Sequence, residues 1–329
     1  MHILITGGAG FLGQRLARQL LHHPQVKRLT LADVMTLPNF QNTADQAANQ
    51  AANQATDQAT IVSRQVDLTN AKAVKALITP DITAVYHLAA VVSSQAEAKF
   101  DLGVAVNADG TRNLLEAIRH QATGAQLIFA SSLAVFGGEL PDVITDKTAV
   151  TPQSSYGTQK AIAELWVNDY TRKGFINGVV LRLPTVVVRP GKPNAAASSF
   201  ASSIIREPLN GQAAICPVDT RLPLWLASPE TVTANLVHAL SLSNYNFEAN
   251  RTINLPGLTL TVQAMVESLV RVSGQSTADF IQYEPEESIS RIVASWPSQF
   301  EVNRAIALGF TRDRSFEDII HAFIKDNLT

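Results

Sequence analysis

Short apolar runs alternate with amphipathic stretches along the first half of the chain. The apolar runs predict strands at residues 3–5, 29–32, 61–66, 84–90, 126–130 and 179–183. Between them, apolar residues that repeat with the period of a helix predict helices at residues 11–21, 73–77, 104–120 and 156–170. Strands that alternate with helices in this way predict an α/β fold with a doubly wound parallel sheet.

The same alternation of strands and helices continues in the C-terminal part of the chain. One segment in the first half interrupts it. Strands are expected at 251–255 and near 280–284, and helices at 261–273 and 315–325. The interruption is segment 39–60, NFQNTADQAANQAANQATDQAT, which consists almost wholly of Ala, Gln, Asn, Asp and Thr. It has no apolar face that could dock on a core, so we expect a mobile, solvated insertion rather than a partner-binding segment.

A glycine-rich turn joins the first predicted strand to the first predicted helix. Gly7, Gly10 and Gly13 allow a tight turn, a close approach of the backbone to a pyrophosphate, and close packing of helix on strand. The start of the helix offers N–H groups and partial positive charge to a phosphate. Asp33 ends the second strand about twenty residues later, where a carboxylate can bind a ribose hydroxyl. The turn therefore predicts a bound dinucleotide.

Tyr156 and Lys160 lie four residues apart on a predicted helix. This spacing puts both on one helical face, and the ammonium group would lower the tyrosine pKa from about 10 toward neutrality. Tyr156 is thus a candidate general base toward an alcohol, with Ser132, at the end of the 126–130 strand, holding the hydroxyl. The same spacing also occurs on solvated helices without catalysis. We expect His87 to serve in packing or hydrogen bonding rather than catalysis.

Composition narrows the class of protein. The 329 residues carry a formal net charge of −2 and are 46% hydrophobic, so nothing favours nucleic acid as a partner. The single cysteine, Cys216, excludes an intramolecular disulfide, fits a reducing compartment and is expected to pack in the core. No apolar run is long enough to span a bilayer, since Arg182 and Arg189 interrupt the most apolar region. No leader precedes the first strand, so we expect a cytoplasmic protein. We expect neither a membrane partner nor a metal site.

Five motifs together resemble those of the extended short-chain dehydrogenase/reductase family, which includes NAD-dependent epimerases and dehydratases. They are TGGAGFLG at 6–13, HLAA at 87–90, Asn107 ahead of Gly110-Thr111, SSLAVFG at 131–137 and YGTQK at 156–160. The resemblance covers nearly the whole chain. It implies a Rossmann domain over residues 1–183, to which 228–257 return, and a smaller interleaved domain over 184–329 that mainly binds substrate.

The same resemblance implies a set of site residues. Ser132, Tyr156 and Lys160 would be catalytic, and Asn107 would support Lys160 through a proton relay. Asp33 and Asp67 would hold the adenosine half of NAD, and Lys160 would bind the nicotinamide ribose. The full set expected at the cofactor is Gly7, Gly10, Phe11, Leu12, Gly13, Asp33, Asp67, Leu68, Leu88, Ala89, Ala90, Asn107, Tyr156, Lys160 and Pro184.

A closer resemblance concerns the substrate. The stretches SSYGTQKA, LRLPTVVVRPGKPNAAASSF, HLAAVVSSQAE and PGLTLTV are similar to those of a branch that oxidises D-erythronate, a small sugar acid, at C2. A carboxylate would be bound by a cation after Pro184, in the order of preference Arg189, Lys192, Arg221 and Arg206, although most of these are expected to be surface charges. The expected substrate residues are Ser93, Ser132, Tyr156, Arg189, Lys192 and Arg221.

Other functions stay open on the same fold. A nucleotide-sugar 4-epimerase is the nearest alternative. A nucleotide-sugar dehydratase is disfavoured, because Leu133-Ala134 follow Ser132 where that chemistry usually has an Asp-Glu pair. A non-catalytic dinucleotide-binding sensor is a further alternative, although such proteins tend to lose the tyrosine or the lysine. A homodimer is left open as the oligomeric state.

Overall fold

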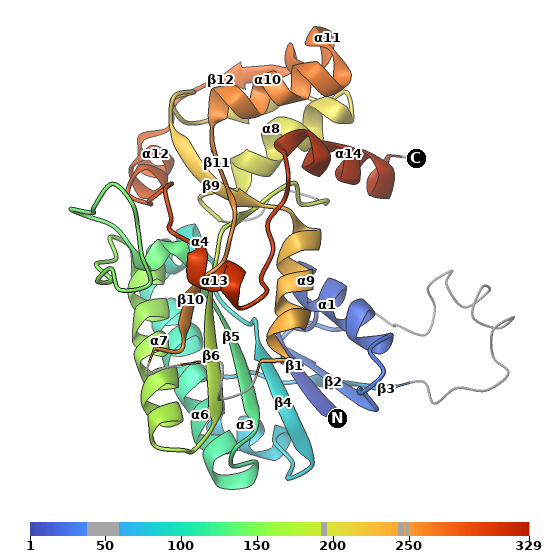
Figure 1. The fold of residues 1–329 in the computed structure, drawn as a ribbon, viewed down its shortest axis with the longest axis vertical. Helices are drawn as coiled ribbons and strands as arrows, with labels where there is room; N and C mark the ends of the chain where they lie inside the picture. Colours follow the sequence, from blue (N-terminus) through green and yellow to red (C-terminus); the bar gives the residue numbers. More distant parts are fainter. Residues whose placement is uncertain (38–58, 192–195, 243–246, 248–249, 329) are drawn as a thin grey trace, which may run out of the picture.

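A seven-stranded parallel sheet forms the centre of the molecule. The computed structural model describes residues 1–37, 59–191, 196–242, 247 and 250–328. The strand order is β10-β6-β5-β4-β1-β2-β3, and every neighbouring pair is parallel (Figure 1). The strands are β1 (His2–Thr6), β2 (Arg28–Asp33), β3 (Thr60–Gln65), β4 (Ile82–His87), β5 (Gln126–Ser132), β6 (Asn177–Leu183) and β10 (Thr252–Asn254). The order reverses between β1 and β4, which confirms the predicted doubly wound, Rossmann-type sheet.

Helices cover both faces of this sheet. One face carries α1 (Phe11–Leu21) and α9 (Pro229–Ala239), and the other carries α3 (Ala71–Leu77), α6 (Gly110–Gln121) and α7 (Ser155–Arg172). Successive side chains of a strand point to opposite faces, so Ile3 and Ile5 pack toward α1 while Leu4 packs in the cluster on the other face. Both faces are therefore covered over the central strands β1, β4, β5 and β6, which is why these strands are largely apolar, whereas the edge strand β3 is mostly exposed.

Most of the remaining elements form a second unit beyond the carboxyl ends of the strands (Figure 1). Its sheets are β11-β9-β7 and β12-β8, from β7 (Thr185–Val186), β8 (Ala214–Cys216), β9 (Pro223–Ala227), β11 (Leu258–Thr261) and β12 (Ile281–Tyr283). Its helices are α8 (Ser199–Leu209), α10 (Val262–Ser273), α11 (Gln275–Ala278), α12 (Glu287–Ala294) and α14 (Phe316–Asn327). Phe200, Met265 and Phe316 belong to its separate apolar core. The chain crosses between the two units several times, because α9, β10 and α13 (Asn303–Ala307) lie against the large sheet.

Two predicted elements differ from the structure. The strand expected over 84–90 ends at His87, because Ala89 lies directly against Gly7 of the glycine turn. The helix expected over 104–120 begins instead with a π-helical turn, η2 (Val104–Asp109), and becomes α-helical only at Gly110. Before it come α4 (Ser93–Ala98) and α5 (Phe100–Gly103). A π turn is a local widening of the helix that often marks a functional site.

Some predictions fall on residues outside the described ranges. The Ala/Gln/Asn-rich segment 39–60 is one, since only its last two residues are described and Thr60 begins β3. Lys192 is another. Within the described residues, no helix has the length and apolarity needed to cross a membrane.

Candidate active site

The glycine turn between β1 and α1 has the geometry of a phosphate cradle. Gly7 has a φ of +76°, and a Cβ atom there would lie 2.7 Å from the backbone N of Ala89. A Cβ on Gly13 would lie 2.2 Å from the carbonyl O of Gly7. No side chain caps α1 at Gly10, so the first N–H groups of the helix have no side-chain acceptor. Only glycine fits at these positions, and the cradle suits the pyrophosphate of a dinucleotide.

Asp33 stands beside this cradle at the carboxyl end of β2. Its carboxylate accepts hydrogen bonds from the backbone N of Ala9 and of Met35, both at 3.0 Å. The group is therefore fixed next to the glycine turn, where a ribose hydroxyl could reach it. Asp67 is exposed and accepts from the backbone N and hydroxyl of Thr69, so it caps a turn at the end of the next strand.

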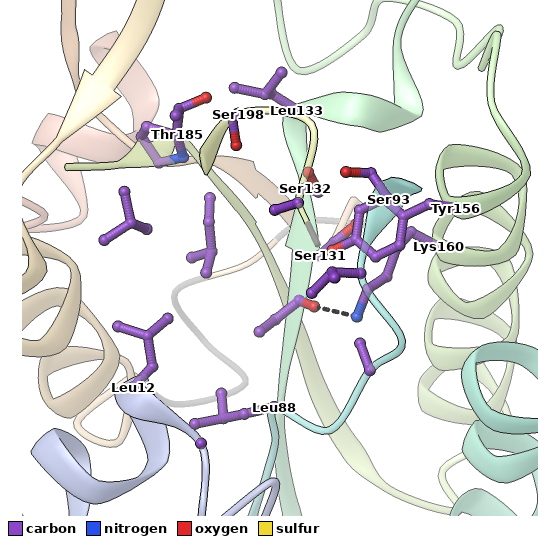
Figure 2. Close-up of a pocket in the computed structure, with 18 of the residues that line it drawn as sticks. Leu12, Leu88, Ser93, Ser131, Ser132, Leu133, Tyr156, Lys160, Thr185 and Ser198 are labelled. Carbon is purple, nitrogen blue, oxygen red and sulfur yellow. Dashed lines mark hydrogen bonds between the residues drawn. The ribbon is translucent and has the colours of Figure 1, made fainter. Parts of the chain in front are cut away.

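A cavity of about 340 Å³ extends from the glycine turn along the carboxyl ends of β4, β5 and β6. The predicted cofactor residues that line it are Gly7, Gly10, Phe11, Leu12, Gly13, Leu88, Ala90, Tyr156, Lys160 and Pro184. Five others lie outside its lining, namely Asp33, Asp67, Leu68, Ala89 and Asn107. Figure 2 shows Leu12 and Leu88 on one side of the cavity, and Ser132, Tyr156 and Lys160 together on the other.

The three residues meet because α7 packs unusually close to the end of β5. Ser132 is the last residue of β5, and the short 3₁₀ turn η3 (Leu133–Val135) follows it. A Cβ on Gly157 would lie only 2.0 Å from the carbonyl O of Ala134, so glycine is required where α7 crosses this turn. Ser154 caps α7 by accepting from the backbone N of Gly157. The cap and the glycine bring the start of α7, with Tyr156, beside Ser132.

Burial shifts the pKa values of Tyr156 and Lys160 in opposite directions, because it disfavours the charged form of each group. It raises the pKa of Tyr156 to about 12, while a hydrogen bond with Ser132 acts in the lowering direction. It lowers the pKa of Lys160 to about 8, while the carboxylate of Glu164 acts in the raising direction. Lys160 Nζ donates to the carbonyl O of Ala130 at 2.9 Å and lies 5.8 Å from the centre of the Tyr156 ring. The expected fall of the tyrosine pKa is therefore wrong, because desolvation of the phenolate outweighs the hydrogen bond with Ser132 that lowers the pKa.

Asn107 takes part in a different set of contacts from the one expected. It lies in the π turn, accepts from the backbone N of Val91, and donates to the carbonyl O of Val91 and to Oε1 of Gln159 at 2.9 and 2.7 Å. In the described part of the chain it forms no hydrogen bond with Lys160. Asn107 thus ties α7 to the loop after β4 rather than touching Lys160 directly.

His87 is a buried hydrogen-bonding group, as the sequence predicted. Its ring nitrogens lie 2.7 Å from the hydroxyl of Thr6 and 2.9 Å from that of Thr111, and Thr111 donates to the carbonyl O of Asn107. Burial, and then the charge of Lys160, lower the pKa of His87 to about 3. The neutral imidazole therefore bridges β1 to the π turn.

The candidate carboxylate-binding cations separate clearly. Arg189 lines the cavity, as does Ser93. Arg206 is buried and pairs with Glu207 at 2.6 Å, while Arg221 is exposed and pairs with Asp219 at 2.7 Å, and neither lines the cavity. Among the candidate cations that the structure describes, Arg189 is therefore the one that lines the cavity.

Several lining residues were missed from the sequence. Thr185, Ser198 and Trp296 line the cavity near Arg189, and Figure 2 shows Thr185 and Ser198 together at one end of it. They come from segments far apart in the chain, after β6, before α8 and after α12. Thr185 follows the predicted Pro184 directly, which is the only sequence signal for it; Ser198 and Trp296 have none.

The model of the NAD dependent epimerase/dehydratase family matches residues 3–239, which hold the glycine cradle, the end of β5 and the Tyr156–Lys160 pair. The chain belongs to this family. The relatives within the family bear on the chemistry.

Two curated relatives in the epimerase/dehydratase family match along the full length. D-erythronate dehydrogenase of Haemophilus influenzae is 48% identical over 327 residues, covering 99% of both chains. D-erythronate dehydrogenase of Cupriavidus necator is 49% identical, covering 99% of this chain and 98% of the relative. The crystal structure of a nucleoside-diphosphate-sugar epimerase from Agrobacterium tumefaciens superposes with a TM-score of 0.89 at 40% identity, covering 100% of this chain and 94% of that one. The full-length relatives assign the chain to the dehydrogenases of the family, which act on a CH–OH group.

Proposed function

We propose that the chain oxidises D-erythronate at C2 to 2-dehydro-D-erythronate, with NAD as the oxidant. The observation that carries the proposal is the meeting of Ser132, Tyr156 and Lys160 in one cavity with the glycine cradle. The choice of substrate is supported by two relatives named for D-erythronate, each matched over nearly its whole length.

The residues present fit NAD. Gly7 and Gly13 leave the space that a pyrophosphate needs, and α1 offers it uncapped N–H groups. Asp33 would accept from the hydroxyls of the adenosine ribose, and its charge would repel a 2′-phosphate, which favours NAD over NADP. When bound, NAD supplies a hydride acceptor at C4 of its nicotinamide ring.

Three side chains, Ser132, Tyr156 and Lys160, take part in the proton transfer. Ser132 donates to or accepts from the C2 hydroxyl and holds it toward Tyr156, whose phenolate takes the hydroxyl proton. As the O–H bond breaks, the C2–H bonding pair leaves as hydride and the C2=O bond forms, so one proton and one hydride leave the alcohol. Lys160 stabilises the phenolate, against the burial that raises the pKa of Tyr156 to about 12.

Arg189 is proposed to bind the substrate carboxylate. It lines the cavity, as do the hydroxyl-bearing residues Thr185 and Ser198, which Figure 2 shows together at one end of it. Burial, and then the charge of Arg206, lower its pKa from the ordinary arginine value, and the negative charge of a bound carboxylate would oppose both effects. Hydroxyls at this end suit the remaining hydroxyl groups of a sugar acid.

A nucleotide-sugar 4-epimerase is the second candidate, favoured by the structural likeness to the Agrobacterium epimerase. The two full-length relatives named for D-erythronate argue for the small sugar acid instead. A non-catalytic sensor is less favoured, since it would not need the tyrosine and lysine in one wall of the cavity.

The location and the partners are proposed from composition. A cytoplasmic protein without nucleic-acid or membrane partners fits the net charge of −2 and the single cysteine, which is buried. The proposed partner is a small sugar acid.

The test is an assay of NADH formation by the purified chain with D-erythronate, other four-carbon acids and UDP-sugars. The proposal expects the highest kcat/KM for D-erythronate. Conversion of a UDP-sugar to its 4-epimer, with no turnover of four-carbon acids, would replace it with the epimerase. Tight NADH binding without turnover of any compound would favour the sensor.

A further inference from the structure

A buried ion pair joins α7 to β6 one helical turn beyond Lys160. The side chains of Glu164 on α7 and Arg182 on β6 are 4% and 7% exposed. Arg182 Nη2 lies 2.6 Å from Oε2 of Glu164, and Arg182 Nε donates to both carboxylate oxygens, at 2.9 and 3.2 Å. The guanidinium also stacks on the ring of Phe136. The pair is thus rigid and dry.

Two connections join Glu164 to the catalytic residues. On α7, Tyr156, Lys160 and Glu164 follow one another at intervals of four, so Glu164 is one turn from Lys160 on the same helical face. Across the gap to β5, the hydroxyl of Ser131 donates to Oε1 of Glu164 at 2.5 Å, and Ser131 precedes Ser132. The carboxylate therefore touches the strand end that presents Ser132 and faces the ammonium group that acts on Tyr156.

The charges around Lys160 leave Glu164 with a distinct role. Lys160 is 3% exposed, and its Nζ lies between the carbonyl O of Ala130 and the ring of Phe129, 4.7 Å from the ring centre. His87 faces it from β4 but is neutral above acid pH, because its pKa is lowered to about 3. Tyr156 faces it as a neutral phenol until it loses its proton.

Arg182 is the opposing charge. It lies on β6, and its charge is compensated by its hydrogen bonds to the carboxylate of Glu164. Glu164 is the acidic group whose charge favours the ammonium form of Lys160, while burial disfavours it.

We propose that Glu164 is a positioning residue for the reaction proposed above. Its buried carboxylate keeps Lys160 in the ammonium form that stabilises the phenolate of Tyr156 and binds the nicotinamide ribose. A purely structural role for the Glu164–Arg182 pair predicts a change of stability alone, because buried ion pairs can often be replaced by apolar groups without loss of the fold. The proposal predicts a change in pH dependence as well.

The test uses Glu164→Gln, which keeps an oxygen for Ser131 and Arg182 and removes the negative charge. NADH binding is measured by fluorescence across pH without substrate, and kcat for D-erythronate across the same range. In the native chain the affinity for NADH falls as Lys160 loses its proton, which happens near its pKa of about 8. Without the carboxylate this proton is lost at lower pH, so the basic limb of both profiles moves to lower pH by about one unit.

A second variant covers the case in which Arg182, left unpaired, prevents folding. Glu164→Gln with Arg182→Met removes both charges and restores a neutral interior, and its basic limb should still move to lower pH, by less than in the single variant. The control is Asp169→Asn, because Asp169 is an exposed carboxylate on the same helix that pairs with Arg172. Its profiles should match those of the native chain.

The outcomes are distinguishable. Native basic limbs in the single and double variants, with only the melting temperature changed, overturn the proposal and leave a structural ion pair. A shift in the single variant that disappears in the double variant also overturns it, because the unpaired Arg182 is then the cause. A shifted NADH profile in a chain that does not oxidise D-erythronate supports the role of Glu164 while rejecting the proposed substrate.

Discussion

Two opposing effects act on the hydroxyl of Tyr156. The spacing of Tyr156 and Lys160 correctly places both on one face of α7, and an ammonium group favours the phenolate. Burial disfavours the phenolate, and it wins in the chain without ligands, where the pKa rises to about 12. Spacing is visible in a sequence, whereas the degree of burial of a phenol depends on elements packed around it.

Replacing Tyr156 by phenylalanine removes the proposed base and leaves the ring. We expect kcat for D-erythronate to fall by about 10² to 10⁴, because that is the usual contribution of a positioned base. The Kd for NADH should stay within about twofold, since the pyrophosphate cradle is untouched. Residual turnover within tenfold of the native rate would assign the base to another group.

Asp33 decides the choice of cofactor. The native chain should have a higher kcat/KM with NAD than with NADP, because the carboxylate of Asp33 would repel the 2′-phosphate of NADP. Asp33→Asn keeps the size of the side chain, removes the repulsion and should narrow that preference by at least about tenfold. Equal use of both cofactors by the native chain would mean that Asp33 does not face the ribose.

At the scale of elements, the catalytic geometry depends on how closely α7 crosses η3. Gly157 is required there, since a Cβ would lie 2.0 Å from the carbonyl O of Ala134. Gly157→Ala must push the start of α7 away from β5, at a cost of about 2 kcal/mol in the free energy of unfolding. It should also lower kcat, because Tyr156 moves away from Ser132.

The matched control for this change is Gly110→Ala, at the start of α6. Its nearest neighbour would be the Cβ atom of Leu68 at 3.1 Å, which needs to give by only a few tenths of an ångström, and alanine favours a helix. We expect a change of less than about 1 kcal/mol and native kcat. Thermal unfolding and steady-state kinetics on both variants give the comparison; equal effects at the two glycines would contradict the importance of the α7–η3 contact.

The elements of the sheet could be predicted from the sequence because their cause is local. Ile3 to Ile5 or Leu127 to Phe129 are apolar on both faces whatever surrounds them, and the period of α1 is visible without the fold. The π turn at Asn107 could not be predicted, because it depends on contacts with Val91 and Gln159 from two other elements.

The same reasoning applies to the site. The glycine turn and the Tyr156–Lys160 pair are contiguous motifs, so they could be found in the sequence. Ser198 and Trp296 line the cavity although their segments are distant from the motifs in the chain. Arg206 and Arg221 follow Arg189 in the sequence but pair with other groups. Which of these residues line the cavity depends on the packing of the second unit.

At the scale of the molecule, four large apolar side chains are exposed on two neighbouring helices. Phe100 and Leu102 of α5 are 60% and 39% exposed, and Leu165 and Ile162 of α7 are 66% and 37% exposed. A second copy of the chain could cover them, and we expect a mass of twice 35.4 kDa by light scattering. Leu165→Lys should shift the chain toward the monomer, whereas Phe280→Lys, at an exposed site on the second unit, should not; a monomeric native chain would contradict the expectation.

The two units of the molecule meet at the cavity. The sheet supplies the cradle and the base, and the chain after β6 supplies Arg189, so a small acid held between them is oriented by contacts from both. Arg189→Met keeps much of the side-chain volume and leaves the substrate carboxylate without its cation in a closed site. We expect kcat/KM for D-erythronate to fall by about 100-fold, or about 2.7 kcal/mol, with NADH affinity nearly unchanged. Arg221→Met is the matched control, because Arg221 is exposed and paired with Asp219, and it should leave kcat/KM native. Equal effects of the two substitutions would mean that another group binds the carboxylate and that the second unit contributes shape rather than charge.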